Sequence, residues 1–176
     1  MLILMALPAE SQGLIEKWVE DHGHALVFTG MGLLNATQKT TQAIHDHQPK
    51  FILNLGTAGS RRHKVGEVVE CNEFVRRDQT LSFLNKKISM NAFSKLPTTS
   101  CGSADFVDTT ENINQYGVVD MEAYAMASVC KDLNIDFGCV KFVSDISDQN
   151  VKTQWEENTK AAADALFQFL AEHFKT

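Results

Sequence analysis

The sequence predicts an α/β fold in which helices flank a central, largely parallel sheet. Two observations lead to this prediction: short apolar runs typical of buried strands alternate with amphipathic helical segments, and glycine or proline residues often separate them. The chain has 176 residues, 44% of them hydrophobic and 22% charged, which is enough to bury a sizeable core. Since neither a linker nor an internal repeat is evident, residues 1–176 are expected to form a single domain.

Apolar runs predict the strands of this sheet, and amphipathic segments predict its helices. The strands are expected over residues 2–7, 25–29, 51–55, 65–75 and 137–143. The helices are expected over residues 10–21, 35–47, 121–133 and 153–173. Asn35 is interpreted as the N-cap of the second helix. Residues 78–100 have mixed polarity and no clear period, so no element is assigned to them.

The charge balance argues against nucleic acid or a membrane as a partner. The net charge is −6, whereas proteins that bind phosphate backbones or anionic lipid need clustered positive charge. The basic run at residues 61–64 is interpreted as a solvated loop. No stretch approaches the ~18 apolar residues of a membrane span, and the apolar start lacks the preceding basic region of a signal peptide.

The cysteines and histidines favour a cytoplasmic protein without a metal site. The four cysteines are well spread and form no CxxC pair, so free thiols in a reducing compartment are expected. The histidine pairs at positions 22 and 24 and at 45 and 47 are two residues apart. Their side chains point away from each other if these segments are helical, which makes a shared metal ion a poor interpretation.

Three carboxylic acids follow predicted strand ends or open predicted helices, and they are the first candidates for chemistry. Ligands of parallel α/β sheets bind outside the carboxyl ends of the strands. Asp145 follows an apolar strand, where partial burial would raise its pKa and suit a general acid, although a turn or N-cap aspartate is the alternative. Glu10 and Glu122 each open a helix, where a carboxylate also has an ordinary role against the helix dipole.

The glycine segments allow two interpretations as well. The segment from Gly30 to Gly32 lacks the third glycine of a dinucleotide fingerprint, and no P-loop lysine follows either segment. The segment from Gly56 to Gly59 either lets the backbone approach a ligand closely or forms only a tight turn.

The order of these segments is more specific than any one of them. Along the chain come MALPAE, TGMGLLNA, LNLGTAG, KVGEVV, SADFV, VDMEA and VSD. In this order the sequence resembles the purine nucleoside phosphorylase/uridine phosphorylase superfamily, and within it the methylthioadenosine/S-adenosylhomocysteine nucleosidases. The resemblance implies a single-domain, three-layer nucleoside-phosphorylase-like fold with a mixed central sheet. It also implies a small-molecule purine nucleoside as substrate, no cofactor, and a homodimer.

The resemblance implies a catalytic role for each of the three carboxylic acids. Asp145 matches the family's general acid, which protonates N7 of the departing purine, and the Ser144 backbone helps to hold the base. Glu10 matches the carboxylate that activates the attacking water. Glu122 matches the glutamate that hydrogen-bonds the ribose hydroxyls, with Met121 packing on the sugar.

The resemblance also implies which residues form the pocket walls. Phe106 matches the aromatic residue that stacks on the purine, and Val107 matches its neighbour, whose backbone reads the base edge. Trp155 falls where the family usually has a Phe that caps the base, although a core anchor in the last helix is an equally good interpretation. The remaining wall residues come from the ends of the first and third strands and are Leu7, Thr57, Ala58 and Gly59.

The nucleophile is predicted to be water rather than phosphate. Phosphorylases of the superfamily carry an Arg just before the third-strand glycine, and a buried phosphate site calls for such a group. This chain has the neutral Asn54 there, and Glu10 would repel phosphate.

Two departures from the family pattern leave other interpretations open. Lys141 replaces the usual Arg four residues before the general acid, and the segment between the fourth predicted strand and Phe106 is strongly shortened. The alternatives are a phosphorylase and a non-catalytic member that binds adenine nucleosides.

Overall fold

The computed structural model describes residues 1–79 and 87–174 of the chain. Its strands are β1 (Leu2–Met5), β2 (Ala25–Phe28), β3 (Phe51–Gly59), β4 (Val68–Arg76), β5 (Ile88–Ser89), β6 (Thr98–Ser103), β7 (Val118–Asp120) and β8 (Asp136–Asp145). Its α-helices are α1 (Leu14–Asp21), α2 (Leu33–His47), α3 (Ala123–Asp132) and α4 (Val151–His173). Two short 3₁₀ helices are η1 (Pro8–Glu10) and η3 (Glu111–Gln115).

The strands form one mixed sheet, most of whose pairings are parallel. β1 lies between β2 and β3, and β3 continues to β8, all in parallel. β8 turns to β4 in antiparallel pairing, β4 runs parallel to β6, and β6 runs parallel to β7. β7 returns to β3 through the antiparallel pair Gly59 and Val119. Strands β3, β8, β4, β6 and β7 therefore close into a ring, with β1 and β2 extending the sheet from β3.

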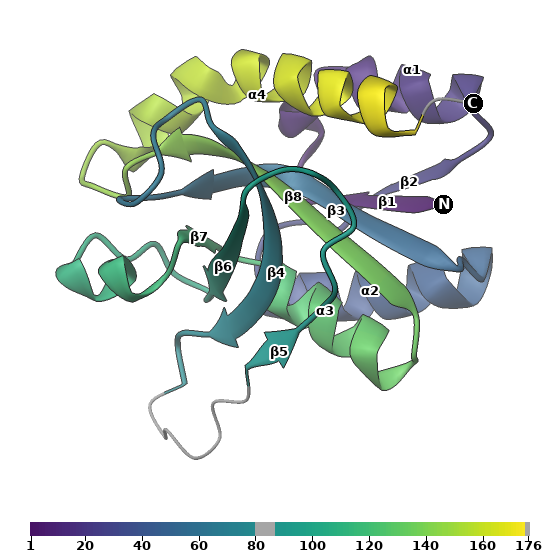
Figure 1. Ribbon diagram of the computed structural model, residues 1–176, viewed down its shortest axis with the longest axis horizontal. Helices are drawn as coiled ribbons and strands as arrows, with labels where there is room; N and C mark the ends of the chain where they lie inside the picture. The colour runs from purple at the N-terminus through teal and green to yellow at the C-terminus, as the bar shows by residue number, and fades with distance from the viewer. Residues whose placement is uncertain (80–86, 175–176) are drawn as a thin grey trace.

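The helices cover the sheet in two layers, as the predicted three-layer fold requires. In Figure 1, α1 and α4 lie on one side of the strands, and α2 and α3 lie on the other. Strand β1 shows why both layers form: Leu2 and Leu4 pack in the core beneath α2 and α3, whereas Ile3 and Met5 pack beneath α1 and α4.

The structure corrects three expectations. The segment from Gly56 to Gly59 belongs to β3, so the tight-turn interpretation is wrong. Helix α2 begins after Gly32, and the Asn35 side chain donates a hydrogen bond to the Met31 carbonyl instead of capping the helix. Strands β6 and β7 were not predicted because β6 is polar and β7 has only three residues. Part of the unassigned segment, residues 80–86, lies outside the described residues.

Within residues 1–79 and 87–174, none of the helices combines the length and apolar character needed to cross a membrane.

Candidate active site

A cavity of about 410 Å³ opens at the carboxyl ends of β1, β3, β6, β7 and β8. All twelve residues that the sequence analysis placed in the site line this cavity. They are Leu7, Glu10, Thr57, Ala58, Gly59, Phe106, Val107, Met121, Glu122, Ser144, Asp145 and Trp155. The structure thus brings these residues together, while the role of each remains a prediction.

Glu10 is buried at the end of η1, directly after the first strand, and bonds to two segments. Its Oε1 accepts hydrogen bonds from the backbone N–H of Thr57 (2.8 Å) and from the Thr57 hydroxyl (2.7 Å). Its Oε2 accepts one from the Leu7 N–H (3.1 Å), a local bond typical of a helix start. The carboxylate is therefore fixed between β1 and β3 and faces the cavity.

Asp145 is the last residue of β8 and only 4% exposed. Its Oδ2 accepts from the Ser144 hydroxyl (2.7 Å), and its Oδ1 accepts from the Ser147 N–H (2.9 Å). Burial raises the pKa of Asp145 above its ordinary value, although these hydrogen bonds act to lower it. Asp145 both makes a turn contact with Ser147 and lines the cavity. A role as a turn residue is therefore compatible with a role in the site.

Glu122 precedes α3 and reaches across to the start of α2. Its Oε1 accepts a hydrogen bond from the Gly32 N–H (2.8 Å). Burial, helped by the nearby Asp120 charge, raises the pKa of Glu122 to about 8. Its carboxyl group is therefore mostly protonated at neutral pH, so it can donate a hydrogen bond as well as accept one.

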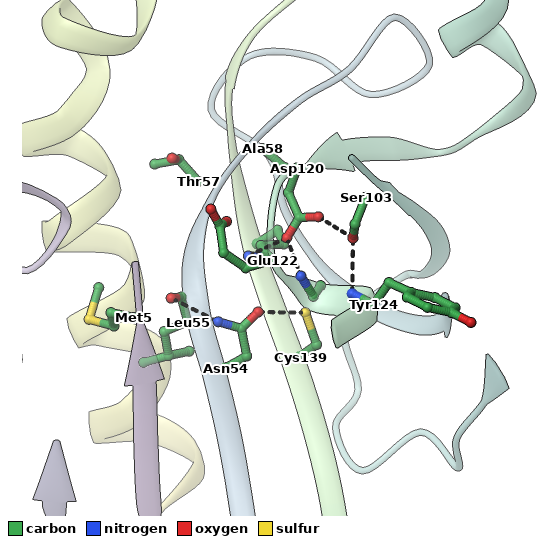
Figure 2. Close-up of polar contacts among 12 residues, drawn as sticks. Met5, Asn54, Leu55, Thr57, Ala58, Ser103, Asp120, Glu122, Tyr124 and Cys139 are labelled. Carbon is green, nitrogen blue, oxygen red and sulfur yellow. Dashed lines mark hydrogen bonds and ion pairs between the residues drawn. The ribbon is translucent and has the colours of Figure 1, made fainter. Parts of the chain in front are cut away.

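Lys141 lies beneath the cavity and pairs with Asp120. Its Nζ is 3.0 Å from Asp120 Oδ2, and both side chains are almost fully buried. Asp120 also accepts hydrogen bonds from the Ser103 hydroxyl and the Ala123 N–H, and Ser103 in turn accepts from the Tyr124 N–H (Figure 2). This network fixes the start of α3 and thus the backbone that carries Glu122.

The glycines of β3 leave room for these carboxyl groups. A Cβ on Gly59 would lie 2.6 Å from Asp145 Oδ1, and it would also collide with the Ser147 hydroxyl. A Cβ on Gly56 would lie 3.2 Å from Glu10 Oε1 and 3.3 Å from Lys141 Nζ. The absence of a side chain at these glycines therefore lets side chains from β8 and η1 lie close to the backbone of β3.

Asn54 is buried in the sheet below the cavity and does not line it. Its Nδ2 donates to the Leu4 carbonyl (3.0 Å) and weakly to Leu55, and its Oδ1 accepts from the Cys139 thiol (Figure 2). The side chain is neutral and its polar atoms are engaged, so this position supplies no positive charge for an anion.

The cavity wall contains two aromatic residues, Trp155, which is held by a hydrogen bond, and Phe106, which is partly exposed. Trp155, in the first turns of α4, donates from its indole N–H to the Thr57 hydroxyl (2.9 Å), which itself bonds Glu10. Phe106 and Val107 are about half exposed at the cavity mouth. Trp155 thus combines a place in the cavity wall with an anchoring hydrogen bond.

Sequence reasoning missed five polar residues of the cavity wall, namely Arg77, Asp108, Asp120, Ser147 and Lys152. Arg77 directly follows β4. Its place as a polar residue at a strand end could have identified it, but residues 78–100, to which no element was assigned, begin next to it. Asp108 and Ser147 lie two residues beyond Phe106 and Asp145, in loops whose conformation the sequence pattern does not specify.

Known proteins resemble this chain in sequence. The sequence profile of the phosphorylase superfamily matches residues 98–175. The 5′-methylthioadenosine/S-adenosylhomocysteine nucleosidase of Buchnera aphidicola is 28% identical over 171 residues, covering 78% of this chain and 73% of the relative.

Solved structures share the fold. The 5′-methylthioadenosine/S-adenosylhomocysteine nucleosidase of Neisseria meningitidis, in complex with methylthio-immucillin-A, superposes with a TM-score of 0.84 at 20% identity and covers 99% of this chain and 97% of its own. A futalosine hydrolase mutant of Helicobacter pylori superposes with a TM-score of 0.83 at 17% identity and covers 98% and 97%. The profile match over residues 98–175, the curated relative and the common fold all make this chain similar to members of the phosphorylase superfamily.

Proposed function

We propose that this protein hydrolyses the N-glycosidic bond of purine nucleosides of the methylthioadenosine or adenosylhomocysteine kind and releases the free base. The observation that carries the proposal is the convergence of Glu10, Glu122 and Asp145 on one cavity. These three acids come from segments far apart in the sequence, and relatives of this chain bear the name of nucleosidases acting on these substrates.

Asp145 is proposed as the general acid. Cleavage of the bond expels a poor leaving group, the purine anion, and protonation at N7 converts it into a neutral base. The buried position of Asp145 raises the pKa of its carboxyl group above its ordinary value, which supports a role as proton donor. The N7 proton comes from Asp145 Oδ, and the solvent returns it after the base departs.

Glu10 and Glu122 are proposed to act on the sugar side. Glu10 accepts a proton from the attacking water, which adds to the sugar carbon as the bond to the base breaks. Glu122 binds the ribose hydroxyls, and Met121 packs on the sugar. Since positive charge develops on the ribose in the transition state, a fixed carboxylate nearby stabilises it. The three hydrogen bonds that hold Glu10 support this assignment.

The walls of the cavity are proposed to hold the base. Phe106 stacks on the purine, the Val107 and Ser144 backbones contact its edge, and Trp155 closes the other side. The end of β3, at Thr57, Ala58 and Gly59, completes the pocket beside Leu7. The fit of a flat base is supported by the two aromatic residues, Phe106 and Trp155, in the cavity lining.

Water is proposed as the nucleophile rather than phosphate. The buried Asn54, whose polar atoms are engaged within the sheet, supports this choice, as does the carboxylate of Glu10 beside the proposed attack position. A doubly charged anion next to an unneutralised carboxylate is electrostatically unfavourable.

The test is release of base from methylthioadenosine, adenosylhomocysteine, adenosine and inosine, measured with and without phosphate. Equal rates in both buffers are expected. Strict dependence on phosphate would instead establish a phosphorylase, and tight binding without release would establish a non-catalytic binding protein.

A homodimer in the cytoplasm is also proposed. The apolar side chains of Met31 and Leu34 are more than half exposed beside the cavity mouth, which supports an interface there. The four cysteines are free, which suits a reducing compartment. Sedimentation equilibrium should give twice the chain mass, and a monomer at micromolar concentration would contradict this part of the proposal.

A further inference from the structure

Arg77 lies in the wall of the cavity and holds the loop that carries Phe106. Its side chain is 4% exposed. Its Nε donates to the Gly102 carbonyl (3.2 Å) and its Nη2 donates to the Phe106 carbonyl (2.8 Å). The guanidinium carbon lies 5.0 Å from the centre of the Phe106 ring, a cation–π distance.

The third nitrogen, Arg77 Nη1, is buried and has no hydrogen-bond partner among residues 1–79 and 87–174. The carboxylate oxygen Asp108 Oδ2 is 3.9 Å away, which is too far for a hydrogen bond. Arginine keeps its charge in proteins, and a buried charged donor without an acceptor is costly. A ligand in the cavity that offers an acceptor would remove this cost.

Asp108 places an acceptor next to this donor. Its Oδ1 accepts from the N–H and the hydroxyl of Thr110, at 2.8 and 2.7 Å. Its other oxygen, Oδ2, faces Arg77. Both residues line the cavity, and the buried donor Arg77 Nη1 lies beside the acceptor Asp108 Oδ2.

This pair lies at the same end of the cavity as Asp145. Arg61 ties the two regions together, because its Nη2 donates to the carbonyls of Thr109 (2.8 Å) and Ser147 (3.2 Å). Thr109 follows Asp108, and Ser147 bonds Asp145. In a purine, the 6-substituent is next to N7 along the ring edge, and N1 follows. A base whose N7 faces Asp145 therefore turns this edge toward the neighbouring wall.

We propose that Arg77 and Asp108 read the six-membered ring of the purine, with Arg77 Nη1 donating to a ring-edge acceptor and Asp108 Oδ2 accepting from the adjacent N–H. Adenine offers N1 as the acceptor and its amino group as the donor. Hypoxanthine offers its 6-oxygen as the acceptor and N1–H as the donor. This inference rests on the proposed function, since it uses the base orientation given there.

The test compares three substrates, the 5′-methylthio forms of adenosine, inosine and 1-deazapurine riboside, the last of which lacks both N1 and the 6-substituent. In Arg77→Met, kcat/KM should fall about tenfold to a hundredfold for at least one of the first two, the size expected for a hydrogen bond to a charged group. For the third it should fall only by the common factor that loss of a loop anchor imposes on all three substrates. A larger fall in kcat/KM for the adenosine form identifies N1 as the acceptor, and a larger fall for the inosine form identifies the 6-oxygen.

Arg61→Met is the matched control. Arg61 also holds carbonyl groups of this loop but does not line the cavity, so its loss should affect all three substrates by the same factor. If Arg77→Met also lowers all three equally, Arg77 only anchors the loop and the inference is wrong. Asp108→Asn, a milder change in a surface loop, should again weaken the two natural bases and spare the third; equal effects on all three would overturn the role of Asp108.

Calorimetric binding of the free bases separates this inference from the proposed function. Wild-type protein should bind adenine or hypoxanthine more tightly than 1-deazapurine, and Arg77→Met should abolish the difference. If no nucleoside is cleaved but this binding pattern appears, the hydrolase proposal fails and the role of Arg77 stands. If the wild type cleaves nucleosides but does not discriminate among the bases, the role of Arg77 fails alone.

Discussion

Asp120 and Glu122 are two residues apart and equally buried, but their pKa values shift in opposite directions. Asp120 is 7% exposed and Glu122 is 6% exposed. Burial acts to raise the pKa of Asp120, but the Lys141 ammonium and the hydrogen bond from Ser103 hold it below its ordinary value. Glu122 has no cation within ion-pair distance in the described part of the chain, and its pKa rises to about 8. The comparison shows that the ion-pair partner, more than the depth of burial, decides the charge of a carboxyl group here.

Removal of the cation should have the largest effect on stability. Lys141→Met leaves Asp120 buried and unpaired, which is expected to cost about 3–5 kcal/mol of unfolding free energy. Urea denaturation measures the loss. The double variant Lys141→Met with Asp120→Asn should recover much of it; a double variant as unstable as the single one would show that the pair itself is not responsible.

Asp145 extends the comparison to a carboxyl group proposed to use its raised pKa in catalysis. Asp145→Asn cannot donate a carboxyl proton, so turnover should fall by about 10²–10⁴-fold. Circular dichroism should confirm that the variant is folded. A rate near that of the wild type would eliminate Asp145 as the general acid.

Gly59→Ala tests whether the position of Asp145 matters as well as its proton. The added methyl group would overlap the space of Asp145 Oδ1 and the Ser147 hydroxyl. A displacement of about 1 Å at a reacting group costs about a hundredfold in rate, so kcat should fall by about that factor. A rate near that of the wild type would show that the position of Asp145 does not limit catalysis.

Glu122→Gln should change stability in the opposite direction, as a gain. Because the pKa of Glu122 is about 8 when folded and near 4.5 when unfolded, the folded chain keeps a proton that the unfolded chain releases. Wild-type stability should therefore fall as pH rises from about 4.5 to about 8. Glutamine does not titrate, so the melting temperature of the variant should exceed that of the wild type by a margin that grows from pH 5 to pH 8. For a chain of this size, a change of about 1 kcal/mol in unfolding free energy shifts the melting temperature by about 2–4 °C. A constant margin would contradict the raised pKa.

Much of the candidate site could be predicted because its residues follow apolar strands. Glu10, Thr57 and Asp145 each stand at a strand end or just after one, and parallel strands bring such ends to one edge of a sheet. The pairing of Lys141 with Asp120 could not be predicted, since it depends on the register of β8 against its neighbours. Arg77 was missed because its partners Gly102 and Phe106 lie in and after β6, a strand too polar to be recognised from the sequence.

The ring formed by β3, β8, β4, β6 and β7 has a consequence for how such a site can diversify. In a closed ring each strand is hydrogen-bonded on both sides, so the ends that carry Gly59, Asp120 and Asp145 keep their spacing when a neighbouring loop is altered. Residues 106–110 lie in a loop outside the ring, so a changed side chain there does not alter the pairing of the ring strands. If this loop binds the base as proposed, its side chains can be varied to change base selectivity while the strand ends that carry Gly59, Asp120 and Asp145 stay in place.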